Sequence, residues 1–220
     1  MVTQLALEPR YSKLASLRRM IQVIRHDRHA SGDIVLHKAD VFLGQIGASQ
    51  QRDLAGINPL IPPIDIEELR GLAPGSFGRA YAEFLDQNGL HPFTVSEAMP
   101  PVVVTRNAHW ARYALMHDMF HVLLGYGPDL AGELGVYGFS LAQRTSWMFW
   151  AYLPLAMLVV PLLAPHRAPR MVRNFARGFR LGRALDNLLA ERLELRFATP
   201  LTELRTELGI DAPIKTGHTA

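Results

Sequence analysis

Residues 105–143, TRNAHWARYALMHDMFHVLLGYGPDLAGELGVYGFSLAQ, decide the fold class of this chain. Apolar side chains recur through this stretch at helical spacing up to Leu124, and the Gly-Tyr-Gly turn at residues 125–127 then stops the helix. Pro128 stands where the first position of a second helix is expected, and that helix continues to about Gln143. The sequence therefore predicts two antiparallel helices joined by a short turn.

Helical patterns also dominate the sequence on both sides of this pair. A capping box is predicted at Asp65 and Glu68, and the Asn-Gly step at residues 88–89 should end the next helix, which begins after a serine cap. Three valines at residues 102–104 form the only β-like run, within a segment expected to be a loop over residues 90–104. Further helices are expected over residues 9–28, 33–46, 185–197 and 200–208. We therefore expect an all-α fold, a single-domain multi-helix bundle.

The composition is that of a folded domain without cysteine chemistry. Of the 220 residues, 49% are hydrophobic and 20% are charged, which excludes a disordered chain. The absence of cysteine excludes disulfides, thiolate nucleophiles, iron–sulfur clusters and cysteine-bound zinc. A metal ion in this protein must therefore be held by histidine and carboxylate side chains.

Two histidines and two carboxylates in the opening stretch have the spacing of a metal site. His117 and His121 are four residues apart and share one face of a helix, which Asp118 borders. Glu133 follows beyond the turn, where a returning helix can bring it opposite the histidines. Two imidazoles and two carboxylates suit zinc, iron or manganese. The alternative is an ordinary set of hydrogen-bonded side chains, but burying Asp118 without a counter-ion would cost several kcal/mol.

An apolar run follows the two helices. Residues 145–165 carry no charge and are numerous enough to cross a bilayer, but Pro154 and Pro161 should kink or end a helix there. We expect a helix in the core or on a membrane surface in preference to a membrane span. A wholly buried core helix and one that contacts lipid are left as equal alternatives.

Positive charge is concentrated next to this run, although the net charge of the chain is only +3. Residues 141–185 hold seven arginines and no acid. Four of them recur at helical spacing, which predicts an amphipathic basic helix, and these four are Arg170, Arg173, Arg177 and Arg180. A face that rests on anionic headgroups is the sharper interpretation, and a solvated arginine face is the simpler one. Nucleic-acid binding is not expected, since no known module is present.

The motif H-D-x-x-H-x11-E, formed by His117, Asp118, His121 and Glu133, resembles the signature of the ubiquinone (coenzyme Q) biosynthesis protein 4 family. Three further segments resemble that family in the same order: GSFGRAYAEFLDQNGLHP upstream, RYALMHDMFHVLLG around the motif, and PLTELRTELGIDAP near the C-terminus. The resemblance covers about residues 70–214, and the first 60 residues match less clearly.

The resemblance implies an all-helical protein with a divalent metal at the motif, usually zinc, with iron or manganese as alternatives. The four motif residues carry over as the metal ligands. The implied activity is loss of the C1 carboxylate from a 4-hydroxy-3-methoxy-5-polyprenylbenzoate, sometimes coupled to oxidation. Asp118, or a water at the metal, would deliver the proton to C1. A non-catalytic scaffold that binds prenyl lipid is the alternative function, and a soluble metallohydrolase is a third.

The resemblance also implies partners and a location. The expected partners are a polyprenylated hydroxybenzoate or quinone intermediate, an anionic membrane surface, other ubiquinone-biosynthesis proteins and a second copy of the chain. We expect peripheral attachment to the cytoplasmic face of a bacterial inner membrane, or to the matrix side of the mitochondrial inner membrane in a eukaryote. The expected divisions are N-terminal helices with a proline-rich linker over residues 1–64, the family-like helical domain over residues 65–214, and a tail over residues 215–220.

Overall fold

The computed structural model describes residues 12–26, 31–43 and 48–210, and within these ranges the chain forms helices and no β-sheet. The all-α fold is therefore confirmed. The expected helix start at Pro9 and the tail over residues 215–220 lie outside the described residues. In chain order the helices are α1 (Lys13–His26), α2 (Ser31–Lys38) with a π-helical turn η1 (Ala39–Leu43), α3 (Ala48–Leu54), α4 (Ile66–Arg70), α5 (Phe77–Asn88), α6 (Pro101–Arg106), α7 (Ala108–Leu124), α8 (Leu130–Ala142), α9 (Trp147–Leu163), the 3-10 turn η2 (Pro165–Arg167), α10 (Ala168–Ala184), the 3-10 turn η3 (Leu193–Leu195) and α11 (Leu201–Glu207).

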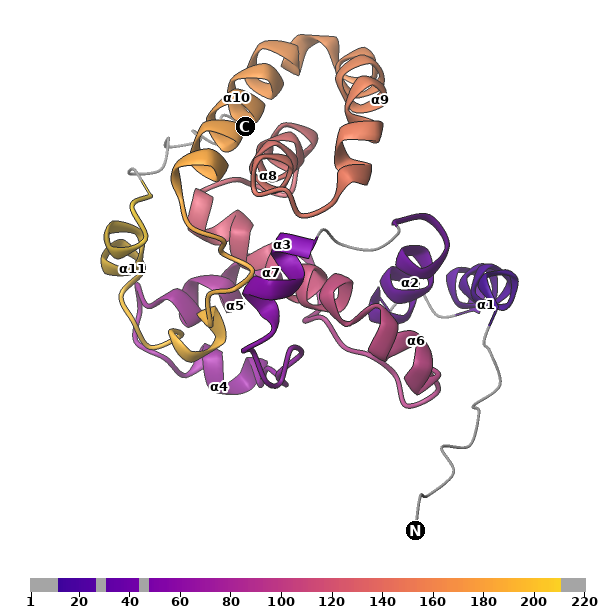
Figure 1. Cartoon of the computed structure of the whole chain (residues 1–220). Helices are drawn as coiled ribbons and strands as arrows, with labels where there is room; N and C mark the ends of the chain where they lie inside the picture. Colours follow the sequence, from indigo (N-terminus) through magenta and orange to yellow (C-terminus); the bar gives the residue numbers. More distant parts are fainter. Residues whose placement is uncertain (1–11, 27–30, 44–47, 211–220) are drawn as a thin grey trace.

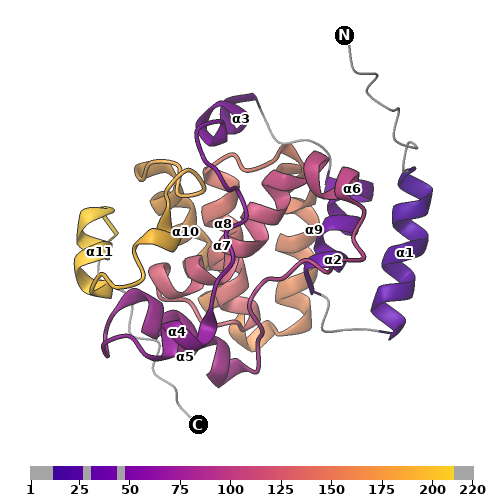
Figure 2. The ribbon, with the colours of Figure 1, turned by 90° about the horizontal axis from the view of Figure 1, so that it is seen from below.

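Helix α7 lies in the middle of the molecule, with α1 and α11 at opposite edges in both views (Figures 1 and 2). Most of its side chains are buried in the core, whereas Tyr113, His117 and Asp118 on one side of the helix are partly exposed. Trp110, Met116, Met119, Phe120 and Leu123 are each no more than 2% exposed. These buried side chains anchor α7, which carries the polar side chains of the site.

Helix α8 packs mainly along α10, whereas the sequence predicted α7 as its antiparallel partner. The two helices run parallel, because Gly135 meets Gly178 and Phe139 meets Gly182 further along both. A Cβ at Gly178 would lie 2.0 Å from the Gly135 carbonyl oxygen, so glycine is required for this close approach. Helix α9 forms the crossover between them (Figure 1).

The N-terminal helices are attached to the core through buried carboxylates. Asp40 accepts hydrogen bonds from Arg106 and Asn107 of the α6–α7 junction and from Ser16 of α1. Burial alone would raise the pKa of Asp40, but these donors outweigh it and hold the pKa below its usual value. Asp33 accepts from the backbone and hydroxyl of Ser96 in the same manner.

Several predicted helix ends are confirmed. Asp65 caps α4 by accepting from the backbone N–H groups of Glu67 and Glu68. Ser76 caps α5 through Arg79, and Gly89 ends that helix in the left-handed conformation, with φ of 61°.

Three expectations about the helices were wrong. The expected loop over residues 90–104 holds up to Pro100, but residues 101–104 belong to α6, because Pro101 supplies the fixed φ of a first helical position. Pro128 precedes the helix cap, since Asp129 caps α8 and the helix begins at Leu130. Residues 185–197 form turns and the short η3 instead of a helix, because their carbonyl groups face a buried arginine of α7.

The apolar run and the arginine block have a different arrangement from the one expected. Helix α9 continues past Pro154 and Pro161 without ending, and one face of it is exposed, with Trp147 at 65% and Leu162 at 70%. It is therefore not a wholly buried core helix. Among the described residues, no helix combines the length and the apolar character that a membrane crossing needs. In α10, Arg173 and Arg180 are exposed, but Arg177 is buried and so does not belong to the surface face.

Candidate metal centre

The turn between α7 and α8 brings the predicted site residues together. Gly125 adopts φ of 73°, a left-handed conformation that ends α7 directly after the turn that carries His121. Gly132 lies so close to this turn that a Cβ there would be 1.8 Å from the carbonyl oxygen of Gly127. The first turn of α8 is thus pressed against the end of α7, and Glu133 follows at once.

The α7–α8 turn brings three of the predicted residues into one cluster and places Glu133 against its two histidines. His117, Asp118 and His121 each offer one potential ligand atom, and these three atoms lie within 4.8 Å of each other. Glu133 reaches back from α8, with Oε2 3.5 Å from Nε2 of His117 and Oε1 3.2 Å from Nε2 of His121. The two imidazole rings meet edge-on with centroids 4.9 Å apart.

Each imidazole has its Nδ1 atom turned to a protein partner and its Nε2 atom turned toward Glu133. Nδ1 of His117 lies 3.1 Å from Oδ1 of Asp118. Nδ1 of His121 lies 3.3 Å from the carbonyl oxygen of Tyr126, which can only accept, so this nitrogen carries the hydrogen. In metal sites, a hydrogen bond to the ring nitrogen that does not face the metal fixes the tautomer of a histidine in this way.

The Nε2 atom of His121 is the strongest sign that a cation belongs here. The His121 side chain is 1% exposed, and its Nε2 atom is buried without a hydrogen-bond partner among the described residues. The 3.2 Å contact with Glu133 lacks the angles of a hydrogen bond. In neutral His121 a nitrogen lone pair therefore faces a carboxylate, and a positive ion between the two atoms would remove this repulsion. The donor set accordingly fits a divalent metal ion.

The pKa values of two residues describe how the site balances its charges without a metal. Burial by itself would lower the pKa of His117, but the carboxylates of Asp118 and Glu133 outweigh it and raise the pKa to about 9. Burial would raise the pKa of Glu133, but the two histidines outweigh it and lower the pKa to about 2. At neutral pH, without metal, His117 therefore carries a proton that a metal ion would have to replace.

The site is closed on the side of α7 and open on the side of Glu133. The Glu133 side chain is 45% exposed, and those of His117 and Asp118 are each 27% exposed. Phe84 of α5 stacks on the buried His121 ring, with centroids 5.6 Å apart, and Tyr113 meets the His117 ring edge-on at 5.9 Å. A ligand can thus approach from the Glu133 side against an aromatic wall.

The sequence did not indicate two residues that support the site. Phe84 lies in a helix distant along the chain, and no spacing rule connects it to His121. Tyr126 acts through its backbone carbonyl, which every residue has, so its identity carried no signal. Tyr113 lies one turn before His117 on the same helix, and its ring contacts that of His117.

Comparison with known proteins adds an independent finding. The family model of the coenzyme Q (ubiquinone) biosynthesis protein Coq4 matches residues 60–213 of the chain. Among mitochondrial COQ4 homologues, the bovine protein is 33% identical over 163 residues and the human protein is 32% identical over 162. Each alignment covers 68% of this chain and 56% of the relative, so the chain spans little more than half the length of these relatives.

A solved structure shows the same fold. The crystal structure of a protein from Nostoc punctiforme, described as a ubiquinone biosynthesis protein, superposes with a TM-score of 0.60. The superposition covers 91% of this chain and 97% of the other. Sequence identity is 19%, so this likeness supports the arrangement of helices and carries no argument about activity.

Proposed function

The chain belongs to the coenzyme Q (ubiquinone) biosynthesis protein Coq4 family, and from this premise we propose that it removes the C1 carboxylate of a 4-hydroxy-3-methoxy-5-polyprenylbenzoate with a divalent metal ion. Family membership assigns the chain to ubiquinone biosynthesis. The reaction, the ion and the substrate are our proposal. The observation that carries it is the buried Nε2 atom of His121 facing the Glu133 carboxylate, which calls for a cation.

The reaction needs a place for negative charge and a source of one proton. The bond between C1 and the carboxylate breaks, its electron pair stays with the ring, carbon dioxide leaves, and a proton takes its place on C1. A bound divalent ion supplies a Lewis acid that stabilises negative charge on the ring 4-oxygen. His117, His121 and Glu133 would hold this ion, with zinc as the first candidate and iron or manganese as the others.

Asp118 is the residue to which we assign the proton. Its carboxylate lies 3.1 Å from Nδ1 of His117 and is partly exposed, so it borders the open side of the site. From this position it can both orient His117 and hold a proton for transfer to C1. Direct coordination by Asp118 is the other role that its place in the cluster allows.

The proposal is tested with His121→Ala, because this change removes the most buried donor of the site. We expect the purified variant to contain no bound metal by elemental mass spectrometry and to convert no prenylated hydroxybenzoate, while its helical circular dichroism is retained. His91→Ala, in an exposed stretch after α5, is the matched control and should behave as wild type. A metal-free His121→Ala protein that decarboxylates normally would refute the metal-dependent reaction.

One observation favours the second candidate function, a scaffold that binds prenyl lipid without catalysis. Helix α9 exposes five large apolar side chains at helical spacing, and exposed apolar patches of this kind can mark a lipid-binding or interaction surface; they are Trp147, Trp150, Leu155, Leu158 and Leu162. A scaffold would co-purify with lipid and bind prenylated substrate unchanged. Recovery of the product after incubation with substrate therefore separates the two candidates.

We also propose that this surface of α9, with the exposed arginines of α10, rests on an anionic membrane. Arg144 and Arg167 flank α9, and Arg173 and Arg180 point outward from α10. Each arginine near a charged bilayer adds about 1 kcal/mol. Replacing Arg173 and Arg180 with Gln should therefore weaken flotation with anionic liposomes by about tenfold or more. Unchanged flotation would exclude α10 from the docking surface.

The remaining expectations extend the same proposal. Peripheral attachment would place the site beside a substrate whose prenyl tail remains in the bilayer. The bovine and human relatives are mitochondrial proteins, and for this chain a membrane face, bacterial or mitochondrial, follows only from the docking proposal. Contacts with other ubiquinone-biosynthesis proteins and with a second copy would use the same exposed apolar helix.

A further inference from the structure

Two arginines from later helices enclose the C-terminal end of α7. Arg205 of α11 donates to the carbonyl oxygens of Val122 at 2.6 Å and Leu123 at 2.8 Å, and Arg177 of α10 donates to that of Leu124 at 2.8 Å. The last carbonyls of a helix have no partner within the helix and carry partial negative charge. The two guanidinium groups thus fix the last turn of α7, which directly follows His121.

Arg177 holds the turn at a second point. Its guanidinium carbon lies 5.3 Å from the centre of the Tyr126 ring, a cation–π contact. The Tyr126 hydroxyl donates to the carbonyl oxygen of Asn174 at 3.1 Å. A Cβ at Gly135 would lie 2.6 Å from the same ring, so Tyr126 fills the space that Gly135 leaves. The side chain of Tyr126 is therefore fixed by α8 and α10 together.

The backbone of Tyr126 in turn fixes the imidazole of His121. Its N–H donates to the carbonyl oxygen of His121 at 2.9 Å, and its own carbonyl oxygen accepts from Nδ1 of His121 at 3.3 Å. The place of this carbonyl decides which ring nitrogen carries the hydrogen and where Nε2 points. A shift of the turn would free both the tautomer of His121 and the direction of its Nε2 atom.

Burial of the Arg177 guanidinium is unfavourable for the stability of the fold. It is 8% exposed, and among the described residues its Nη2 atom has no hydrogen-bond partner and its guanidinium has no ion pair. A buried charge without a counter-ion is unfavourable, and an apolar side chain of similar size would avoid that penalty. We propose that Arg177 is a positioning residue for the metal ligand His121, acting through the carbonyl of Leu124 and the ring of Tyr126. This inference rests on the proposed metal centre.

The test compares Arg177→Met with Arg177→Lys in the full chain, using zinc as the probe. Methionine keeps the aliphatic volume but loses the cation and its hydrogen bond, so zinc affinity should fall about 10- to 100-fold, the usual effect of losing an outer partner of a metal ligand. Lysine keeps the cation and one donor, and it should recover most of that affinity. Arg173→Met, exposed on the same helix, is the matched control and should bind zinc as wild type.

Nitrogen NMR of the metal-free protein separates positioning from a general loss of structure. Wild-type His121 should carry its hydrogen on Nδ1, and Arg177→Met should show a mixture of tautomers in an otherwise folded spectrum. If wild type binds no zinc, the proposed metal centre fails, but the tautomer measurement still tests the role of Arg177. If Arg177→Met does not fold, Arg177→Gln replaces it and should lose about tenfold in zinc affinity. A folded Met or Gln variant with wild-type zinc affinity, or wild-type His121 protonated on Nε2, would overturn the inference.

Discussion

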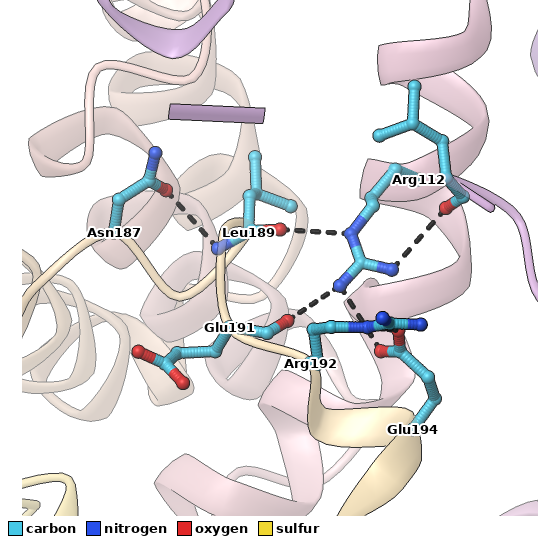
Figure 3. Close-up of polar contacts among 7 residues, drawn as sticks. Arg112, Asn187, Leu189, Glu191, Arg192 and Glu194 are labelled. Atoms are coloured by element: carbon cyan, nitrogen blue, oxygen red, sulfur yellow. Dashed lines mark hydrogen bonds and ion pairs between the residues drawn. The ribbon is translucent and has the colours of Figure 1, made fainter. Parts of the chain in front are cut away.

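Helix α7 carries two polar clusters five residues apart, and they differ in how completely the protein satisfies them. Arg112 is fully buried and donates to the carbonyl oxygens of Leu189 and Glu191 and to the carboxylate of Glu194, as Figure 3 shows. It also donates to the carbonyl oxygen of Leu60. Nine residues later on the same helix, His121 is equally buried, but its Nε2 atom has no hydrogen-bond partner among the described residues. The first cluster is closed by the chain itself, and the second is left open.

The difference indicates which cluster maintains the fold and which performs chemistry. The Arg112–Glu194 ion pair joins side chains that are 0% and 4% exposed, and Arg192 adds a second contact to Glu194. Each nitrogen of the Arg112 guanidinium and the Glu194 carboxylate meets a protein partner, so no ligand is needed. In the histidine cluster, the open side near Glu133 and the unpaired Nε2 atom leave room for an ion. Burial of charge alone therefore does not mark a functional site, but incomplete satisfaction does.

The largest effect should come from Arg112→Met, which breaks the closed cluster. The change leaves three carbonyl groups without their donor and the buried Glu194 carboxylate with Arg192 alone, and we expect the free energy of unfolding to fall by about 3–5 kcal/mol. Urea unfolding followed by circular dichroism measures this. Arg196→Met removes a pair with Glu207 that is largely exposed, and it should cost less than about 1 kcal/mol. Equal losses in the two variants would contradict the comparison.

The next effect should come from Asp118→Asn in the open cluster. The amide preserves the size of the side chain, so the fold and substrate binding should survive. It removes the carboxyl group to which we assign the transfer of the proton to C1. We expect the decarboxylation rate to fall about 10²- to 10³-fold, as for the loss of one electrostatic catalytic contact. Single-turnover conversion of a prenylated hydroxybenzoate measures the rate. Normal turnover by this variant would remove Asp118 from the reaction.

One substitution made in both clusters sharpens the comparison. Glu133→Gln should lower zinc affinity about 10- to 100-fold, with little change in the stability of the metal-free protein, because Glu133 is 45% exposed. Glu194→Gln should leave zinc affinity unchanged and lower the free energy of unfolding by about 1–2 kcal/mol, since the buried guanidinium loses its counter-ion. Zinc titration and urea unfolding of both variants provide the four values. A shared response would show that the two clusters act as one.

The smallest expected effect is the change of zinc affinity per pH unit. His117 has a raised pKa of about 9 in the metal-free protein, so it is protonated below that pH, and an incoming metal must displace the proton. Zinc affinity should therefore rise about tenfold per pH unit from pH 7 and level off near pH 9. In Glu133→Gln the loss of a carboxylate that raises the pKa of His117 should move the plateau to lower pH. Calorimetric titration at several pH values tests both statements.

Local patterns were sufficient for much of the fold and for the membership of the site. The left-handed glycines at residues 89 and 125 and the caps at Asp65 and Ser76 follow from chemistry within one turn of the chain. The spacing of His117, Asp118, His121 and Glu133 across a short turn was enough to predict that these side chains meet. The structure brings them together, although the main partner of α8 is α10 and not α7.

Errors occurred where distant segments control local structure. Residues 185–197 have a helical pattern, but Arg112 draws their carbonyl groups out of helical hydrogen bonds. Arg177 has the spacing of a surface arginine, but the close glycine contacts between α8 and α10 bury it against the end of α7.

The sequence by itself determined that this protein is helical, that it lacks cysteine chemistry, and that two histidines and a glutamate can share one site. These properties depend on residue type and on spacing within a few turns, where geometry is fixed by the helix. Only the tertiary structure decided which buried charges are satisfied by the chain and which are left open. That outcome depends on carbonyl groups and rings brought from residues far apart in the sequence, and backbone groups leave no trace in the identity of a residue.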